Sequence, residues 1–327
     1  MRAPGKALLL LVNLNRSLWL LRLGRRLHAA FGGRWGQLQD PAILRKHIPG
    51  WWRPDPSRTV SMTIVEGTRM VLELDDHVQF RTFMDGYFDL VPIALARQLC
   101  QGGLVYLDVG ANVGTTSIPV ANRGVATIAI EASTHILAKL YRNLALNPGA
   151  TMQVFGYAVG EHDGEQVSLF RPLDGNLGAT STLAAWGGGH AVAVEKTTSY
   201  RVDTVLEFLG AGKVGLMKLD IEGAEAAALA GSQRLIAEQM PAVLFEWRPD
   251  IAAHAAGAIR PAHAMLPTHY LLFGVRLAAA QGASGNNLQL SPFDARQSYE
   301  NMLAVTPRNL LHHGLLAAAG ARIESWG

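Results

Sequence analysis

The sequence contains a single cysteine, Cys100, among 327 residues, so it cannot form an internal disulfide bond. A small fold held together by disulfides is therefore excluded, and we expect a reducing compartment such as the cytoplasm. The chain also lacks a Cys/His cluster with metal-ligand spacing. The pairs His263/His269 and His312/His313 have no further ligand at helical spacing, which argues against a zinc-type site.

Long hydrophobic runs are absent as well. The uninterrupted apolar run Ala7–Val12 is far shorter than the roughly 20 residues that cross a bilayer. The composition also excludes a disordered chain, because 49% of the residues are hydrophobic and a chain of this length can bury a large core. We therefore expect one α/β domain with additions at its ends.

Basic charge is scarce outside the N-terminal segment. Residues 1–60 hold 11 of the 29 Lys and Arg residues and 2 of the 26 Asp and Glu residues, which leaves 18 basic and 24 acidic residues for the remainder. A nucleic-acid cleft needs a basic groove lined with aromatic side chains. The mildly acidic body therefore predicts no nucleic-acid partner.

The basic N-terminal segment is open to three interpretations. It combines the apolar stretches Ala7–Val12 and Leu18–Leu21 with Arg22, Arg25 and Arg26. A helix packed on the body is one, peripheral contact of residues 7–26 with an anionic membrane is another, and a signal peptide is the third. No small-residue cleavage site supports secretion.

A proline-containing stretch marks the expected end of the N-terminal extension. The stretch Trp51–Pro56 contains two prolines and closes the segment. We expect a basic, helical extension over residues 1–57, a catalytic domain over 58–310 and a C-terminal tail over 311–327.

The most informative segment is the run Asp108–Gly114, which follows the apolar stretch Leu104–Leu107. It predicts a buried strand that ends in a tight turn, with a helix beginning near Thr115. The spacing Gly-x-x-x-Gly differs from the dinucleotide fingerprint. It suits a cofactor whose amino-acid and ribose parts lie against the turn, of which S-adenosylmethionine is the commonest.

Glu131 ends a second predicted strand, Val125–Ile130. An acid at this position can accept hydrogen bonds from two ribose hydroxyls. Alternatively it is a helix N-terminal charge, because Ser133 and Thr134 can cap a helix over His135–Leu146.

A third strand, Met152–Val159, ends in Ala158 and Val159, whose backbone is expected beside an adenine ring. Further elements follow from apolar patterning. They are strands within Val60–Leu74, a helix over Val91–Cys100, paired segments Glu165–Phe170 and Ala191–Ser199, a hydroxyl-rich loop from Leu173, a helix Val202–Leu209, a strand Val214–Asp220, a helix Glu222–Ala237, and strands Ala242–Glu246, His269–Phe273 and Met302–Thr306.

Five segments, in this order along the chain, resemble the FkbM-type S-adenosylmethionine-dependent methyltransferases. They are Val105–Gly114, Ala129–Glu131, Asn143–Asn147, Arg201–Thr204 and Met217–Glu225. The resemblance covers residues 60–250. Two departures are Ala132, where the family often has proline, and the unmatched residues 1–60.

The resemblance implies a Rossmann-like, seven-stranded class I methyltransferase sheet with flanking helices. It also implies S-adenosyl-L-methionine as cofactor, with Gly110 and Gly114 matching the family's cofactor turn and Glu131 its ribose-binding acid. We further expect Asp108 or Asn112 to form a hydrogen bond near the amino-acid end of the cofactor, and Ala158 and Val159 to lie beside its adenine. Family members are mostly O-methyltransferases acting on sugars, glycolipids and polyketides. A small-molecule or glycan hydroxyl is therefore the expected acceptor, in the cytoplasm or at a membrane surface.

Transfer of a methyl group to a hydroxyl needs an in-line approach and a base that removes the proton. Asp220 is the first candidate for that base, or for orienting the hydroxyl, and Glu222 is the second. The alternative is structural, because acids in a first helical turn are favoured by its dipole. On that view Glu225 pairs with Lys218 or Lys213, and Lys218 pairs with Asp220 or Glu246.

Two other possibilities remain for the chemistry. His190 is an alternative base. Asp220, Glu222 and Glu246 could converge on a divalent ion, but without further ligands we predict no metal site.

Two other functions compete with methyl transfer. A nicotinamide-dependent oxidoreductase is disfavoured by the missing third glycine and the absence of a Tyr-x-x-x-Lys pair. A catalytically silent cofactor-fold protein, which binds a membrane or partner through residues 1–57, is the alternative to an enzyme.

Overall fold

The structure is a computed structural model of the 327-residue chain. It describes residues 59–74, 76–172, 180–183, 191–249, 261–277 and 288–312. The predictions for the extension 1–57, for most of the loop from Leu173, for His190 and for most of the tail 311–327 lie outside these residues. The described residues divide into two compact units, with the boundary between residues 88 and 89.

In the first unit an antiparallel hairpin precedes a short helix. Strands β1 (Thr59–Thr63) and β2 (Arg69–Glu73) pair through the 3-10 turn η3 (Val65–Gly67), which confirms the strands predicted between residues 60 and 74. Helix α4 (His77–Asp85) begins where the Asp76 carboxylate accepts the backbone N–H of Gln79. This helix has no counterpart among the elements predicted from the sequence.

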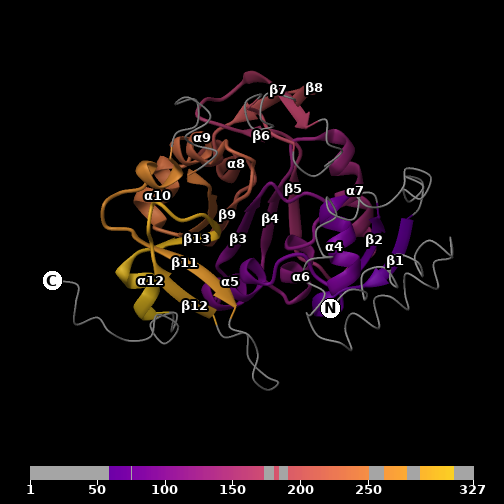
Figure 1. The fold of residues 1–327 in the computed structure, drawn as a ribbon, viewed down its shortest axis with the longest axis horizontal. Helices are drawn as coiled ribbons and strands as arrows, with labels where there is room; N and C mark the ends of the chain where they lie inside the picture. The colour runs from indigo at the N-terminus through magenta and orange to yellow at the C-terminus, as the bar shows by residue number, and fades with distance from the viewer. Residues whose placement is uncertain are drawn as a thin grey trace, which may run out of the picture. The chain divides into compact units, whose positions relative to one another are not determined.

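The second unit carries the remaining elements (Figure 1). Its helices are α5 (Val91–Leu99), α6 (Ser117–Asn122), α7 (Thr134–Ala145), α8 (Val202–Phe208), α9 (Glu225–Ala230), α10 (Gln233–Gln239), the 3-10 helix η4 (Ala262–Met265) and α12 (Pro307–His312). Its strands are β3 (Val105–Val109), β4 (Thr127–Ile130), β5 (Met152–Phe155), β6 (Ala158–Val159), β7 (Glu165–Pro172), β8 (Ala191–Tyr200), β9 (Val214–Leu219), β10 (Ala242–Trp247), β11 (Leu271–Leu277), β12 (Leu288–Pro292) and β13 (Tyr299–Val305).

A central mixed sheet of eight described strands has the order β12-β11-β13-β10-β9-β3-β4-β5. The strands from β10 to β5 are parallel, and β13 joins them antiparallel. The expectation of seven strands was wrong by one, because β12 extends the edge beside β11. Its residues are mostly exposed, so the sequence shows no buried apolar run there.

The strand order reverses between β3 and β9. From β3 the chain proceeds outward through β4 to β5, and it then returns to place β9 on the other side of β3. Parallel sheets bind ligands outside the carboxyl ends of their strands at such a reversal. The fold therefore directs attention to the residues that follow β3, β4, β9 and β10.

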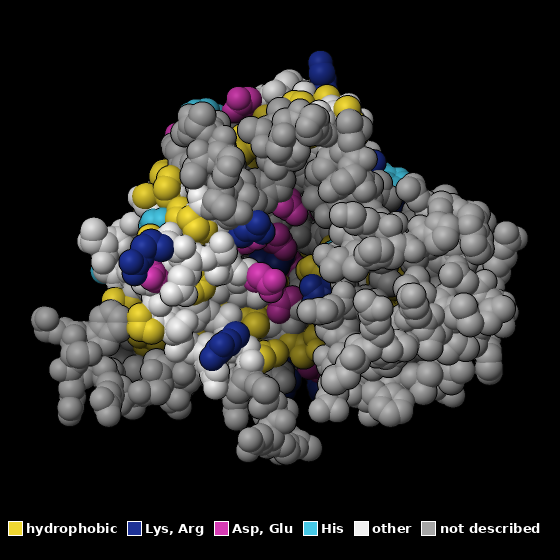
Figure 2. All heavy atoms as spheres, in the orientation of Figure 1, with side chains coloured by type: hydrophobic (Ala, Val, Ile, Leu, Met, Phe, Trp, Pro, Cys, Tyr) yellow, Lys and Arg dark blue, Asp and Glu magenta, His cyan; other side chains and the backbone are white. Residues whose placement is uncertain are grey.

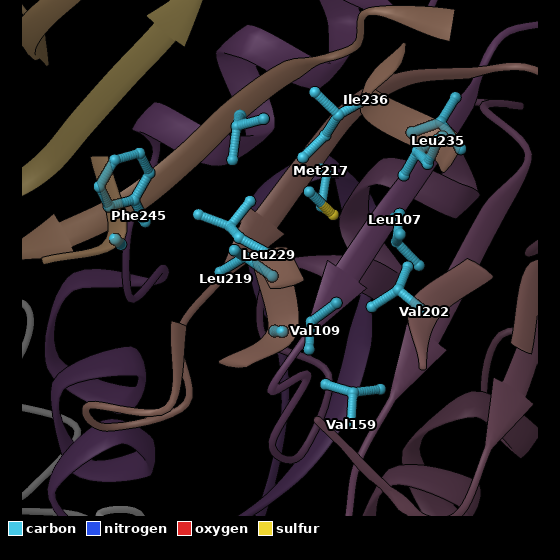
Figure 3. Close-up of a cluster of buried hydrophobic side chains, with 14 of the residues drawn as sticks. Leu107, Val109, Val159, Val202, Met217, Leu219, Leu229, Leu235, Ile236 and Phe245 are labelled. Carbon is cyan, nitrogen blue, oxygen red and sulfur yellow. The ribbon is translucent and has the colours of Figure 1, made fainter. Parts of the chain in front are cut away.

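Alternation along the strands assigns the two faces of the sheet. Odd-numbered residues of β3, β9 and β10 enter a core shared with α8, α9 and α10, and Figure 3 shows Leu107, Met217 and Phe245 among its side chains. Even-numbered residues point to the face covered by α5 and α6. Asp108, Lys218 and Glu246 belong to this second face, which brings charged side chains of three adjacent strands together.

A separate three-stranded sheet, β6-β8-β7, corrects the prediction of one strand over Met152–Val159. The segment divides into β5, which pairs with β4, and β6, which pairs with β8. The predicted pairing of Glu165–Phe170 with Ala191–Ser199 is confirmed by β7 and β8.

The predicted helix Glu222–Ala237 is also divided, into α9 and α10. Asp203 causes the division, because its carboxylate accepts the backbone N–H groups of Arg234 and Leu235, both at 2.9 Å. Its own backbone N–H donates to the carbonyl of Gly231 at 3.0 Å. A cap supplied from 31 residues away leaves no local signal in the sequence.

Across the described ranges no helix is both long and apolar enough to cross a membrane. Cys100 is buried at the end of α5, and burial raises the pKa of its thiol to about 12.

Candidate functional site

The turn after β3 has a backbone that ordinary residues avoid. Gly110, Asn112 and Gly114 have φ values of +81°, +51° and +90°. A Cβ added at Gly110 would overlap the backbone carbonyl of Asp220, and one at Gly114 would lie 2.6 Å from Ile118 Cδ1. The glycines, expected to admit a ligand, thus also let β3 approach the end of β9 and let α6 pack closely.

Glu131 ties this turn to the end of β4. Its carboxylate accepts the backbone N–H groups of Asn112 at 3.0 Å and Ser133 at 2.9 Å. Burial raises the pKa of Glu131 to about 7, although these backbone hydrogen bonds work in the opposite direction. The carboxylate is partly buried and retains further acceptor positions.

Ser133 stands at the N-cap position of α7, but it does not cap the helix through its side chain. The cap comes instead from Glu195 on β8, whose carboxylate accepts the backbone N–H of Thr134 at 3.1 Å. The predicted capping by Ser133 and Thr134 was therefore wrong. Within the described part of the chain, the buried Ser133 hydroxyl has no hydrogen-bond partner.

Asp108 lies fully buried in β3 and its carboxylate is heavily used. One oxygen accepts the hydroxyl groups of Thr116 at 2.7 Å and Ser117 at 2.6 Å, and the other faces Lys218 Nζ at 3.2 Å. Asp108 thus fixes the start of α6 and pairs with the neighbouring strand.

Lys218 connects Asp108 to Asp220. Its Nζ lies 3.2 Å from Asp108 and 3.1 Å from Asp220, and its side chain is 11% exposed whereas that of Asp220 is 42% exposed. Burial alone would lower the pKa of Lys218, but the two carboxylates outweigh it and hold the pKa above its ordinary value. The ion pairs therefore run from the buried strand β3 to a partly exposed carboxylate after β9.

The turn after β9 is held by Glu225. Its carboxylate accepts the backbone N–H groups of Ile221 at 3.1 Å and Gly223 at 3.2 Å. Burial raises the pKa of Glu225 to about 6. Glu222 has a φ of +55°, and its carbonyl accepts the Ser181 hydroxyl at 2.7 Å. Helix α9 therefore starts at Glu225, three residues later than predicted.

Glu246, near the end of β10, is the further acid at this edge. Burial, followed by the nearby charge of Asp220, raises the pKa of Glu246 to about 7, while Arg248 acts against the shift. Arg248 Nη1 lies 3.5 Å from Glu246 Oε1. Asp89, before α5, is close enough for Lys218 and Asp220 to influence its pKa, which burial raises.

The predicted candidates thus fall into two groups along one sheet edge. Asn112 and Glu131 meet at the ends of β3 and β4, and Asp220 follows β9. Ala158 and Val159 are buried in β6. Acidic side chains on the face drawn in Figure 2 gather near its middle with Lys or Arg among them.

From the sequence, Glu246 is predicted only as a charge partner of Lys218 or as a metal ligand. The available signal in the sequence was its place at the end of the apolar strand Ala242–Glu246. The described residues contain no group of three or more His, Cys, Asp or Glu side chains placed to hold a metal ion.

Solved structures that are similar to this chain share little sequence with it. They include a methyltransferase FkbM from Methylobacillus flagellatus KT (18% identity, TM-score 0.36, 62% of this chain and 43% of that chain). A putative O-methyltransferase from Klebsiella pneumoniae has 14% identity and a TM-score of 0.38 over 82% of this chain and 95% of that chain. An O-methyltransferase from Bacillus cereus in complex with SAH has 12% identity and a TM-score of 0.36 over 65% and 78%.

These likenesses carry no argument about function, since their TM-scores are at most 0.38. The matched part spans less than half of the Methylobacillus chain. No curated protein matches the sequence.

The family match is specific to one region. Residues 108–264 match the family model described as Methyltransferase FkbM domain, and they include the turn after β3, Glu131, Lys218, Asp220 and Glu246. The chain therefore carries a domain of the FkbM methyltransferase family.

Proposed function

We propose that this chain transfers the methyl group of S-adenosyl-L-methionine to a hydroxyl group of a sugar, a glycan or another small-molecule natural product. The observation that carries the proposal is the arrangement of Glu131 and Asp220 at the edge where the strand order reverses. A donor site and an acceptor site must lie next to each other for direct transfer. The ends of β3 and β4 suit the donor, and the ends of β9 and β10 suit the acceptor.

The residues around Glu131 fit this cofactor. The buried hydroxyl of Ser133 has no partner within the described residues, and Glu131 has acceptor positions left for ribose hydroxyls. The residues that would hold the cofactor are Asp108, Gly110, Asn112, Gly114, Glu131, Ala158 and Val159. Asp108 would act through the turn, because its carboxylate already binds Thr116, Ser117 and Lys218.

The bound cofactor supplies an electrophilic methyl group on a sulfonium. The protein then has to hold the acceptor hydroxyl in line and receive its proton. Asp220 suits the first task, because its partly exposed carboxylate is fixed by Lys218. Glu222, on the adjoining turn, is the second candidate to contact the acceptor.

An extension that contacts an anionic membrane through residues 7–26 would suit an acceptor attached to a lipid or to the cell envelope. Its basic excess and apolar stretches support that part of the proposal.

The test is incubation of the full chain with methyl-labelled S-adenosylmethionine and fractionated cell extract, followed by identification of the labelled product. We expect label in a glycan or small-molecule fraction, on oxygen. Label found only in protein or nucleic acid would contradict the proposed acceptor class.

A variant separates an enzyme from a silent cofactor-binding protein. Asp220→Asn should retain the fold and S-adenosylmethionine binding but lose most of the transfer. Full transfer by this variant would remove Asp220 from the acceptor site.

A further inference from the structure

Glu246 lies directly beside Asp220 by strand register. In the parallel pair of β9 and β10, Leu244 is opposite Lys218 and Phe245 is opposite Leu219. The next position therefore places Glu246 next to Asp220. By alternation the Glu246 side chain shares the face of the sheet that carries Lys218.

The backbone at Glu246 departs from regular pairing. On its other side β10 pairs antiparallel with β13, with Phe245 opposite Met302, but the register has shifted by the pair Trp247 and Tyr299. Irregularities of this kind change the direction of a side chain and are common next to active sites. The Glu246 side chain is 24% exposed, so it is accessible while largely shielded.

The two neighbouring acids have different partners. Asp220 is bound by the buried Lys218, which is also paired with Asp108. Glu246 forms a longer ion pair with Arg248 at 3.5 Å, and it is influenced by the charges of Asp220 and Glu225. Two adjacent carboxyl groups in unequal environments are a common arrangement for dividing positioning from proton transfer.

We propose that Glu246 is the catalytic residue that accepts the proton of the acceptor hydroxyl, while Asp220 orients that hydroxyl. This inference rests on the proposed function. As the hydroxyl oxygen forms its bond to the methyl carbon, the C–S bond breaks with its electron pair remaining on sulfur, and the hydroxyl proton passes to a carboxylate oxygen of Glu246.

The pKa of about 7 suits this role, because a general base is most effective when its pKa is near the working pH. Removal of a positioned general base typically lowers a rate by about 100-fold or more. Glu246→Gln should therefore transfer label from methyl-labelled S-adenosylmethionine at least about 100-fold more slowly, into the same extract fraction that the wild type labels.

The pH dependence and a conservative variant distinguish catalysis from structure. The wild-type rate should rise with pH around a midpoint near 7, and Glu246→Gln should lose that rise while Glu246→Asp recovers part of the activity. Glu238→Gln, on the exposed surface of α10, is the matched control and should behave as wild type.

A second readout does not depend on turnover. The protein is prepared with ¹³C-labelled glutamate carboxyl groups and followed by NMR, and the resonance that is missing in Glu246→Gln is assigned to Glu246. In the Asp220→Asn variant the titration midpoint of Glu246 should be lower than in the wild type. Calorimetry with S-adenosylmethionine should show similar affinity for wild type and Glu246→Gln.

The outcomes separate the two proposals. If Glu246→Gln transfers label at the wild-type rate, or if Asp220→Asn leaves the Glu246 midpoint unchanged, this inference is overturned and the proposed function stands. If the wild type binds no S-adenosylmethionine and labels nothing, the proposed function fails and this inference fails with it.

Discussion

Glu131 and Glu246 end neighbouring parts of the same sheet edge, and burial raises the pKa of both to about 7. Around Glu131 the backbone N–H groups that oppose the shift outrank the charge of Asp108, whereas at Glu246 the charge of Asp220 is the largest contribution after burial and adds to the shift. The same pKa thus arises in a rigid, hydrogen-bonded environment and in a charged one. From this difference we infer that the β3 and β4 ends suit a bound ligand, whereas the β9 and β10 ends suit proton transfer.

The largest expected effect comes from removing Lys218, the cation of β9 that pairs with Asp108 and Asp220. Lys218→Met leaves the fully buried Asp108 carboxylate without its ion-pair partner. Breaking one side of a buried pair typically costs about 3–5 kcal/mol. Urea unfolding should show a loss of this size for Lys218→Met and little change for the exposed Lys213→Met. Equal stability of the two variants would mean that the pair does not hold β3 against β9.

The next largest effect is expected at Gly110, where the turn after β3 lies against the backbone that follows β9. Gly110→Ala would force a Cβ at φ +81° against the backbone carbonyl of Asp220. Backbone strain alone costs about 1–3 kcal/mol, and the overlap adds to it. We expect lower unfolding free energy and displaced chemical shifts at Asp220. Gly149→Ala, where nothing lies within 4 Å, is the control, and similar losses in both variants would contradict the close approach.

The pH dependence of the unfolding free energy specifically tests the environment of Glu246. Since the pKa of Glu246 is raised from 4.5 to about 7, the unfolded state releases this proton first. The stabilisation that protonated Glu246 provides is therefore complete below pH 4.5 and is lost as the pH rises through about 7.

Glu246→Gln should remove this dependence. Relative to wild type, its unfolding free energy should gain about 1–3 kcal/mol between pH 4 and pH 8. Denaturant titrations at both pH values measure the change. A difference of the opposite sign would show that Glu246 is stabilised as a carboxylate.

The smallest effect on stability is expected at Ser133, whose backbone N–H donates to Glu131. Because its hydroxyl has no partner among the described residues, Ser133→Ala should change stability by less than about 0.5 kcal/mol. Ser232→Ala should cost about 1 kcal/mol, since the Ser232 hydroxyl donates to the Ala228 carbonyl at 2.6 Å. Thermal unfolding of both variants gives the comparison, and a larger loss for Ser133→Ala would indicate a hydrogen bond in solution.

The parallel strands were predictable because both of their faces are buried and their sequences are mostly apolar, as in Val105–Val109 and Val214–Leu219, where Asp108 and Lys218 are the charged exceptions. Edge strand β12 was missed because most of its residues are exposed. The break between α9 and α10 depends on Asp203, far away in sequence. Local patterns carry no information of this kind.

The candidate site divides in the same way. The turn after β3 and Glu131 have local signatures, since a strand must deliver glycines and an acid to its own end. The binding of Lys218 to both Asp108 and Asp220 depends on the register of β3 with β9. The position of Glu246 beside Asp220 depends on the register of β9 with β10, which only the three-dimensional structure shows.

The division of the edge into a ligand-holding half and a proton-handling half is tested most directly by one calorimetric comparison. S-adenosylmethionine is titrated into Glu131→Gln and into Glu246→Gln, each checked for folding by circular dichroism. We predict that Glu131→Gln weakens binding by about 10-fold or more, because a charged hydrogen-bond acceptor is lost, while Glu246→Gln binds as wild type does. Equal weakening in both variants, or weakening in Glu246→Gln alone, would contradict the account.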